Sequence, residues 1–599
     1  MHRRSVSVIA LSVALACLSG GGGQALEQLE FAVAGDDKAL ERSLRAASIL
    51  LADERDRTTD PQDLFADARA EYGRLLAALY AAGHYSGVIN VTIDGREAAG
   101  IAPLDAPASI GRIEVRVDPG PRFAFGRTVI APQAGGTVLP EGFTPGKPAL
   151  SGLVAQSVQA GIGGWRQQGH AKAVVARQDV VADHPARTLS ADIALNPGPR
   201  LRFGRLGIEG QERMREARIR KIAGLPEGEV FDPDDLDRAA SRLRRTGVFS
   251  SVSLTEADAI RAPDLLDITA SVVEAKRRRY TFGAEVASFD GLTLTGGWLH
   301  RNLFGGGERF EIAGEIGNIG VQEGGMDYKL DISLQRPATP GPDTTAAVAL
   351  SLGHLDEDDF EADAFSVGIS FTHFFSEQLT ARAGIAYDFT DGSDVTEDFL
   401  YRSLSLPLGV TWDRRDVKTD ATKGHYLDIE AKPFLGFGTT DNGARLTLDL
   451  RGYRGFGTRF VLAARVQAGA ILGASLLGTP RDDLFYSGGG GTVRGQPYQA
   501  LGVSVLQAGT PLDLGGTHFV GGSIEARVRV GRGFGVVGFF DAGQIGTGFA
   551  SDESAFHSGA GLGVRYDTGF GPIRLDVAAP VGGNTGDGVQ IYVGVGQSF

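Results

Sequence analysis

Residues 379–389 read LTARAGIAYDF, and apolar residues occupy every second position of this stretch. Leu379 and Phe389 belong to the apolar set, whereas Arg382 and Asp388 belong to the other set. Because successive side chains of a β-strand point to opposite faces, this alternation predicts a strand with one apolar and one polar face. The same pattern recurs at 365–372, 446–451 and 523–530.

About 16 segments of this kind fill residues 277–599, which gives about 20 residues for each strand and its connection and fits strands of roughly 9–11 residues that cross a bilayer. Charges such as Asp449 and Glu525 share the polar face and suit a wet lumen rather than a dry core. The pattern predicts a 16-stranded antiparallel transmembrane β-barrel over 277–599. A soluble β-sandwich is the alternative, and it would require several domains.

Composition excludes several classes of protein. Glycine supplies 86 of 599 residues, about twice its ordinary share of roughly 7%. The net charge of −14 argues against a nucleic-acid-binding surface for the whole chain. With one cysteine, a disulfide scaffold and a cysteine-based zinc finger are both excluded.

The start of the chain predicts export. Arg3 and Arg4 precede an apolar run over 6–18, and small residues follow it up to Ala25. This order is typical of a secretory signal peptide, so we expect the first 25 residues to be removed. Lipidation at Cys17 is the alternative, although the residue three positions before it is not the leucine that the lipoprotein motif prefers.

A motif recurs before the barrel. Residues 118–122 read DPGPR and 125–127 read FGR, and the same pattern returns as NPGPR at 196–200 and FGR at 203–205, a shift of 78 residues. A degenerate third copy covers 274–283. Each copy follows a helix-then-strand pattern, and a repeat of this period takes priority over local assignments. The repeats predict three α/β domains, at 26–110, 111–198 and 199–276.

Glycines mark the predicted helix ends within these repeats, because glycine adopts the left-handed conformation that closes a helix. The expected ends are Gly83, Gly169 and Gly247. The alternating strands expected after them are 88–93, 173–181 and 248–254.

Specific motifs lie in the last 200 residues. Residues 488–495 read GGGGTVRG, and our strand count places them between strands 11 and 12. Phe539, Asp541 and Gly543 form an F-x-D-x-G pattern on a later strand, where alternation puts Phe539 and Asp541 on one face. Residues 571–576 read GPIRLD.

Together with three exported α/β repeats and a barrel, these motifs resemble the BamA/TamA superfamily of outer-membrane assembly factors. The repeats of that family are called POTRA domains, and the number three looks like its TamA branch. The family carries its Val-Arg-Gly signature on a long extracellular loop that folds back into the lumen, here 471–516. The loop–lumen lock implied by the resemblance consists of Arg494, Gly495, Phe539, Asp541 and Gly543. Gln496 stands where the family usually has Tyr or Phe.

The resemblance also implies a function. An assembly factor of this family inserts or translocates barrel and autotransporter-type proteins without ATP, by POTRA capture and a lateral seam between its first and last strands. The C-terminal Phe599 resembles an outer-membrane insertion signal. The expected seam lies between the segment that begins near Tyr280 and a final strand that runs up to Phe599. The expected seam and C-terminal signal comprise Tyr280, Phe282, Gly594, Gly596 and Phe599.

Expected partners are unfolded outer-membrane client proteins, a TamB-like inner-membrane protein docked on the first POTRA domain, and outer-membrane lipid. Lys276 to Arg279 fit either lipid head groups or a positively charged linker. No catalytic motif occurs, so we expect no enzyme, cofactor or metal. The alternative function is a protein-conducting transporter of the two-partner secretion kind, whose members typically carry two POTRA domains; a plain porin or receptor is a third possibility.

Overall fold

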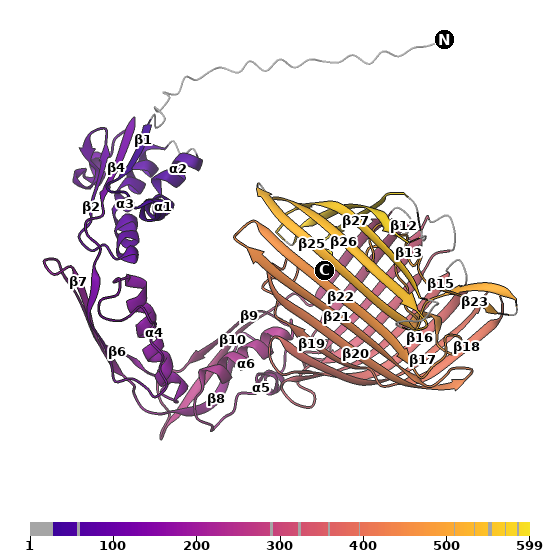
Figure 1. Cartoon of the computed structure of the whole chain (residues 1–599). Coiled ribbons are helices and arrows are strands. Elements are labelled where there is room, and N and C mark those ends of the chain that lie inside the picture. Colours follow the sequence, from indigo (N-terminus) through magenta and orange to yellow (C-terminus); the bar gives the residue numbers. More distant parts are fainter. Residues whose placement is uncertain are drawn as a thin grey trace, which may run out of the picture. The chain divides into compact units, whose positions relative to one another are not determined.

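The computed structural model describes residues 28–56, 60–287, 291–320, 325–356, 360–394, 396–507, 509–531, 533–548, 554–569, 571–583, 586 and 588–599. The predicted signal segment, residues 1–25, lies outside the described residues. The chain forms two compact units (Figure 1). The first is Met1–Phe203 with Gly228–Pro233 and Ile260–Leu266, and the second is Gly204–Glu227 with Asp234–Ala259 and Asp267–Phe599.

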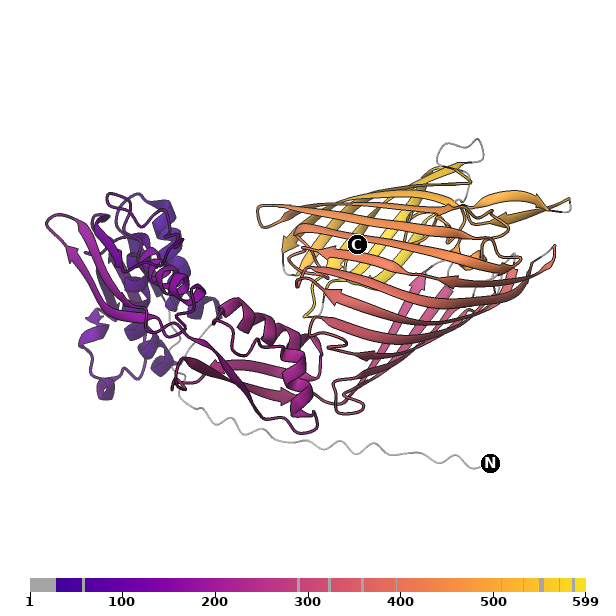
Figure 2. The same ribbon diagram turned by 90° about the horizontal axis from the view of Figure 1, so that it is seen from below.

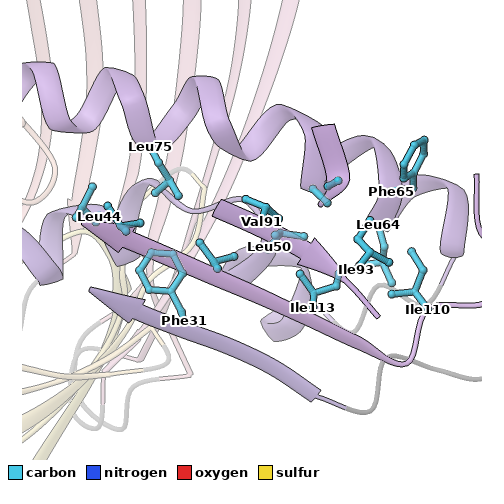
Figure 3. Close-up of a cluster of buried hydrophobic side chains, with 14 of the residues drawn as sticks. Phe31, Leu44, Leu50, Leu64, Phe65, Leu75, Val91, Ile93, Ile110 and Ile113 are labelled. Carbon is cyan, nitrogen blue, oxygen red and sulfur yellow. The ribbon is translucent and has the colours of Figure 1, made fainter. Parts of the chain in front are cut away.

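The first α/β domain packs helices on a four-stranded sheet. Leu44, Leu75 and Val91 are fully buried and point into the layer between helices and sheet (Figure 3). The sheet order is β1-β4-β2-β3. Since β4 pairs with both β1 and β2, the domain extends to Asp118, and the boundary predicted at residue 110 is wrong. The elements are β1 (Gln28–Val33), α1 (Lys38–Ala47), α2 (Leu50–Asp56), α3 (Pro61–Ala82), β2 (Val88–Ile93), β3 (Arg96–Glu97), the short 3₁₀ helices η1 (Ala98–Gly100) and η2 (Pro103–Asp105), and β4 (Arg112–Asp118).

Two further α/β domains follow, each with a three-stranded sheet. The second has the order β5-β7-β6 and the third has the order β8-β10-β9. The second comprises β5 (Ala124–Ala131), α4 (Ser151–Gln167), β6 (Val174–Asp183) and β7 (Thr188–Asn196). The third comprises β8 (Arg202–Glu209), α5 (Glu216–Ala223), α6 (Pro233–Arg245), β9 (Phe249–Glu256) and β10 (Leu265–Glu274).

The predicted local signals agree with these elements. Gly83 caps α3 in the left-handed conformation, with φ +87°. The strand expected at 88–93 has the bounds of β2, while those expected at 173–181 and 248–254 are each displaced by one or two residues relative to β6 and β9. Such shifts are ordinary for element ends that fray.

The repeated Pro-Gly-Pro motif forms the same turn twice. After β4 the side chain of Asp118 accepts the Gly120 N–H at 3.0 Å, and after β7 the side chain of Asn196 accepts the Gly198 N–H at 3.0 Å. Both glycines have positive φ, +61° and +67°, which residues with a Cβ rarely adopt. The motif therefore marks the exit from one α/β domain into the next.

A large antiparallel sheet occupies the rest of the chain and curves round until its first strand meets its last (Figures 1 and 2). β18 and β19 both pair with β17 and with β20, because Pro407 interrupts the strand between them. The strands are β11 (Arg278–Ala287), β12 (Gly291–Arg301), β13 (Arg309–Ile319), β14 (Tyr328–Arg336), β15 (Thr344–Asp356), β16 (Phe360–Phe374), β17 (Leu379–Asp394), β18 (Asp398–Ser405), β19 (Leu408–Asp413), β20 (Lys423–Gly438), β21 (Gly443–Phe456), β22 (Phe460–Leu472), β25 (His518–Gly531), β26 (Phe534–Gly546), β27 (Ala555–Tyr566), β28 (Ile573–Gly582) and β29 (Gln590–Val595).

The two faces of this sheet differ as the alternation predicts. Ile385 and Val466 point outward and are exposed. Arg382 points inward and pairs with Glu430 on β20. An apolar outer face and a charged inner face suit lipid outside and water inside. None of the described helices combines the length and the apolar character needed to cross a membrane.

The first and last strands pair weakly. β11 and β29 share two residue pairs, Val286 with Val593 and Ala287 with Tyr592. On its other side β11 pairs with β12 along its whole length, from Arg278 to Ala287. Residues 278–285 therefore present a strand edge that β29 does not cover.

Within the second unit, arginines of α5 and α6 contact the turns at one end of the sheet. Arg218 donates to the carbonyl oxygen of Gly306 at 3.1 Å and to that of Pro337 at 2.6 Å. Arg242 donates from Nε to Asp343 Oδ1 at 2.8 Å and from Nη2 to Asp343 Oδ2 at 2.5 Å. Charge-assisted, two-pronged bonds of this kind fix orientation as well as distance.

This contact predicts a pH dependence. The Arg242 guanidinium lowers the pKa of the Asp343 carboxyl from its ordinary 3.8. A lowered carboxyl pKa stabilises the contact above pH 3.8, and the stabilisation is lost as the pH falls through the folded-state value. Hydrogen exchange of the turn 337–343, corrected for intrinsic rates, is expected to rise on acidification. In Asp343→Asn this rise should disappear, and an unchanged pH profile in that variant would contradict the assignment.

Candidate functional site

A long loop between β22 and β25 packs against the inner face of the sheet; we call residues 473–517 loop 6. The loop predicted at 471–516 is displaced by two residues at its start and one at its end, because β22 continues to Leu472 and β25 begins at His518. Loop 6 contains the 3₁₀ turn η3 (Arg481–Asp483) and a hairpin of β23 (Val503–Gln507) and β24 (Thr510–Leu514). Its apolar side chains, including Leu484 and Phe485, pack with Phe519 and Ile545 of the wall.

Arg494 is the centre of the contact between loop 6 and the wall. Its side chain is 2% exposed, and it donates to Asp541 twice, from Nε to Oδ2 at 2.7 Å and from Nη2 to Oδ1 at 3.0 Å. Nη1 donates to Glu525 at 2.7 Å and to Asp576 at 3.3 Å. The guanidinium lies 3.6 Å from the ring centroid of Phe539. One loop residue thus contacts β25, β26 and β28 together.

Two further arginines balance the three carboxylates. Arg527 pairs with Glu525 at 2.8 Å, and Arg565 pairs with Asp576. All of these side chains are buried, so each charge depends on its partners rather than on water. The Asp541 side chain also accepts the Arg494 backbone N–H at 3.2 Å, so the loop is held by main chain as well as side chain.

The predicted glycines permit this close approach. Gly495 has φ +94°, and a Cβ there would lie 2.6 Å from the carbonyl oxygen of Ala579. Its N–H donates to the Tyr592 hydroxyl on β29 at 3.1 Å. A Cβ on Gly543 would lie 2.6 Å from Ser487 Oγ on loop 6. The structure thus brings together all five residues of the predicted lock.

We expect Gly495→Ala to release loop 6, because it combines a strained backbone with a clash against main chain. Strain at a positive φ costs on the order of 1–3 kcal/mol before the clash is added. Limited proteolysis of the folded protein should then cleave the loop faster. Gly491→Ala is the matched control, since a Cβ there meets open space. Equal cleavage of the two variants would contradict the role of Gly495.

Gln496 fills the position at which the family usually has an aromatic residue. It is fully buried, and its Nε2 donates to the carbonyl oxygens of Ser558 at 2.8 Å and Gly582 at 3.2 Å. The amide therefore connects loop 6 to β27 and β28 by hydrogen bonds instead of ring packing.

Sequence reasoning missed two partners of the lock. Glu525 lies on the predicted polar face and Asp576 lies in the GPIRLD motif, but the sequence assigns neither of them to Arg494. Strand parity puts each of them on the inner face. Strand parity does not give the position of each residue along the barrel axis, and this position determines which acids contact Arg494.

A second anchor of loop 6 was also missed. Arg481 is 1% exposed and pairs with Asp394 at 3.0 Å, at the end of β17. Its guanidinium lies 5.2 Å from the ring centroid of Phe399 on β18. The loop is thus fixed to two different parts of the sheet.

The predicted seam residues lie at the two ends of the sheet. Tyr280 and Phe282 are on β11 and point outward, and Phe282 is 86% exposed. Gly594 is on β29 opposite Arg574, and Gly596 has φ +93° just after the strand. The prediction that the last strand extends to Phe599 is wrong: β29 ends at Val595, and the final residues turn to the inner face.

Among the described residues, no group of three or more His, Cys, Asp or Glu side chains is placed to hold a metal ion. The arrangement around Arg494 is a buried ionic contact between a loop and a wall, and its chemistry is that of positioning.

Comparisons with known proteins agree with this architecture. Residues 302–599 match the model of the Omp85 superfamily domain, and residues 201–275 match a POTRA model described as a surface antigen variable number repeat. Outer membrane protein assembly factor BamA of Nitratidesulfovibrio vulgaris is 23% identical over 409 residues, which cover 63% of this chain and 48% of that protein. BamA of Neisseria meningitidis serogroup B is 26% identical over 125 residues, which cover 20% of this chain and 16% of that protein. The chain thus spans at most about half the length of these relatives.

Solved structures share the fold. BamA from Haemophilus ducreyi lacking POTRA domains 1–3 superposes with a TM-score of 0.61 at 16% identity, covering 79% of this chain and 100% of that one. CdiB from Acinetobacter baumannii gives a TM-score of 0.52 at 11% identity, covering 79% and 90%. The chain belongs to the Omp85 superfamily, the BamA/TamA type of outer-membrane proteins.

Proposed function

We propose that this protein is an assembly factor that inserts or translocates barrel and autotransporter-type proteins, with no ATP and no enzymatic step. It is an outer-membrane protein whose POTRA domains lie in the periplasm. In this proposal all three α/β domains are POTRA domains, and the sheet is a 16-stranded transmembrane barrel in which β18 and β19 count as one interrupted strand.

The observation that carries the proposal is the weak seam. Two residue pairs join β11 to β29, against ten between β11 and β12. Unpaired backbone groups are not tolerated in lipid, so an open strand edge offers an unfolded client a template on which to pair. The client's own folding then supplies the free energy.

Strand edges in the periplasmic part support capture of clients. β6 lies at the edge of its sheet, and Val174 and Val181 on it are exposed. An extended client segment can add to such an edge as a further strand, with main-chain hydrogen bonds that depend little on sequence. The proposed sequence of events is capture at these edges, transfer to the seam and insertion.

A TamA-type role adds a partner. We propose that a TamB-like inner-membrane protein docks on the first domain, residues 28–118. The support is the number of α/β domains together with the resemblance in sequence. The pull-down that tests this partner uses residues 26–276 as bait.

A two-partner secretion transporter remains the second candidate, favoured by the fold shared with CdiB. Depleting the protein in its host and profiling the outer membrane separates the two functions. An assembly factor predicts loss of several barrel proteins at once. Loss of a single secreted protein, with normal barrel levels, would instead establish the transporter.

A further inference from the structure

The last four residues of the chain, 596–599, leave the sheet and lie on its inner face; we call them the C-terminal tail. Gly596 turns the chain, and its N–H donates to the carbonyl oxygen of Pro572 at 2.7 Å. Phe599 is 7% exposed and packs with Tyr453 and Ala463, which belong to β21 and β22. The tail therefore joins the seam strand β29 to a distant part of the wall.

Arg527 connects the tail to the lock along one path. It donates to the terminal carbonyl oxygen of Phe599 at 3.1 Å and to Glu525 at 2.8 Å. Its guanidinium lies near two rings, 5.4 Å from the centroid of Phe599 and 5.6 Å from that of Tyr453. Glu525 in turn accepts from Arg494 on loop 6 at 2.7 Å.

Arg565 connects the tail to the lock along a second path. Its Nε donates to the Gln597 side chain at 2.9 Å, while its Nη1 binds Asp576. Asp576 also accepts from Arg494. Gln597 continues the path to Asp420, to which it donates at 3.0 Å.

We propose that Arg527 and Arg565 are positioning residues that couple the C-terminal tail to loop 6, so that the seam strand β29 is held while Arg494 is docked. The contacts described for Arg494 include none with Gln597 or Phe599, yet two paths lead from it to them, each made of two ion pairs and a final arginine hydrogen bond to the tail. Removal of Arg494 takes one cationic partner from Glu525 and one from Asp576, so the remaining contacts of Arg527 and Arg565 with these acids readjust, and a disturbance at either end alters the other. Such coupling is reciprocal by thermodynamic linkage.

The consequence concerns opening of the seam. Two residue pairs join β29 to β11, far fewer than the ten that join β11 to β12. The tail attaches β29 to the inner face of the wall through Arg527 and Arg565, whose acid partners also bind Arg494 of loop 6. Movement of loop 6 in the lumen would then weaken this attachment and favour separation of β29 from β11.

Thiol labelling of the intact purified protein tests the coupling. Cys17 is the only cysteine of the chain and lies in the predicted signal segment, so Ser598→Cys supplies a unique thiol on the tail. We expect its reaction with a maleimide to accelerate on the order of tenfold in Arg527→Gln, as for loss of a charge-assisted hydrogen bond. The decisive variant is Arg494→Ala, in which the same acceleration is expected. Heat-modified migration in gels verifies that each variant is folded.

Arg481→Gln is the matched control, because it removes a buried loop 6 arginine whose contacts among the described residues do not lead to the tail. An unchanged rate in that variant supports the coupling. A wild-type rate in Arg494→Ala, or an equal acceleration in Arg481→Gln, would overturn it. The reverse measurement uses Val493→Cys, a fully buried position of loop 6, whose labelling should accelerate when Phe599 is deleted, and no acceleration would also overturn it. The inference rests on the seam of the proposed function, but labelling needs no client, so its failure is distinct from loss of assembly activity.

Discussion

Arg494→Ala is expected to abolish most assembly activity while the protein still reaches the outer membrane at normal levels. The variant leaves Asp541, Glu525 and Asp576 buried together with one cation fewer, and loss of one partner from a buried ion pair costs roughly 3–5 kcal/mol. That shifts the docking equilibrium of the segment around Arg494 by a factor on the order of a hundred or more, because 1.4 kcal/mol corresponds to a factor of ten. The measurement is the level of newly assembled client barrels in cells that carry only the variant.

Arg459→Ala is the matched control, since Arg459 lies exposed in the turn between β21 and β22. Arg494→Lys is expected to recover only part of the activity, because one ammonium cannot reproduce a fork that reaches three carboxylates. An exchange of Arg494 with Asp541 should not rescue, since the new carboxylate would face Glu525 and Asp576. Wild-type client assembly in Arg494→Ala would refute the role of the lock.

A disulfide across the seam is expected to stop assembly. Val286 and Val593 lie directly opposite each other on β11 and β29, so the double variant Val286→Cys with Val593→Cys can close the strand edge covalently. Under oxidising conditions we expect loss of client insertion, and reductant should restore it. The measurement is the yield of folded client in each state.

The control places the same cross-link away from the seam. Leu450 and Val466 are opposite each other on β21 and β22, which pair along their whole length. A disulfide at Leu450→Cys with Val466→Cys should leave assembly unchanged. If the two cross-links impair assembly equally, the seam has no special role.

Local patterns predicted much of this fold because each depends on neighbours in the chain. The alternation at 379–389 requires only strand parity, and it placed Arg382 inside and Ile385 outside correctly. Gly83 at the end of α3 likewise needs only the backbone of its own turn. Strand alternation and helix caps of this kind do not depend on how distant segments pack together.

Other features depend on contacts between distant segments. The first domain boundary was wrong because β4 completes a sheet with β1 and β2, a pairing that no local signal reports. The path of Phe599 was wrong for a similar reason. Apolar residues alternate from Val589 to Val595 and Phe599 keeps the same parity, but the partners that hold the tail on the inner face are Arg527 and Tyr453, which are far away in sequence.

The candidate site lies between these cases. Resemblance to the family motifs predicted the pair of Arg494 and Asp541, and the structure brings them to 2.7 Å. It did not predict that Glu525 and Asp576 complete the site, because no local sequence pattern distinguishes these two acids from the other acids on the inner face. Their roles follow from the height at which loop 6 enters the lumen, which only the three-dimensional structure gives.

Reconstitution without a cell shows whether the protein itself speeds the insertion of a client. The purified full chain is placed in liposomes without any nucleotide, and a urea-unfolded outer-membrane barrel is added as client. We expect the client to fold into the bilayer faster than in protein-free liposomes, and the oxidised Val286→Cys, Val593→Cys variant to remove the acceleration. Equal folding rates with and without the protein would refute the proposed assembly function.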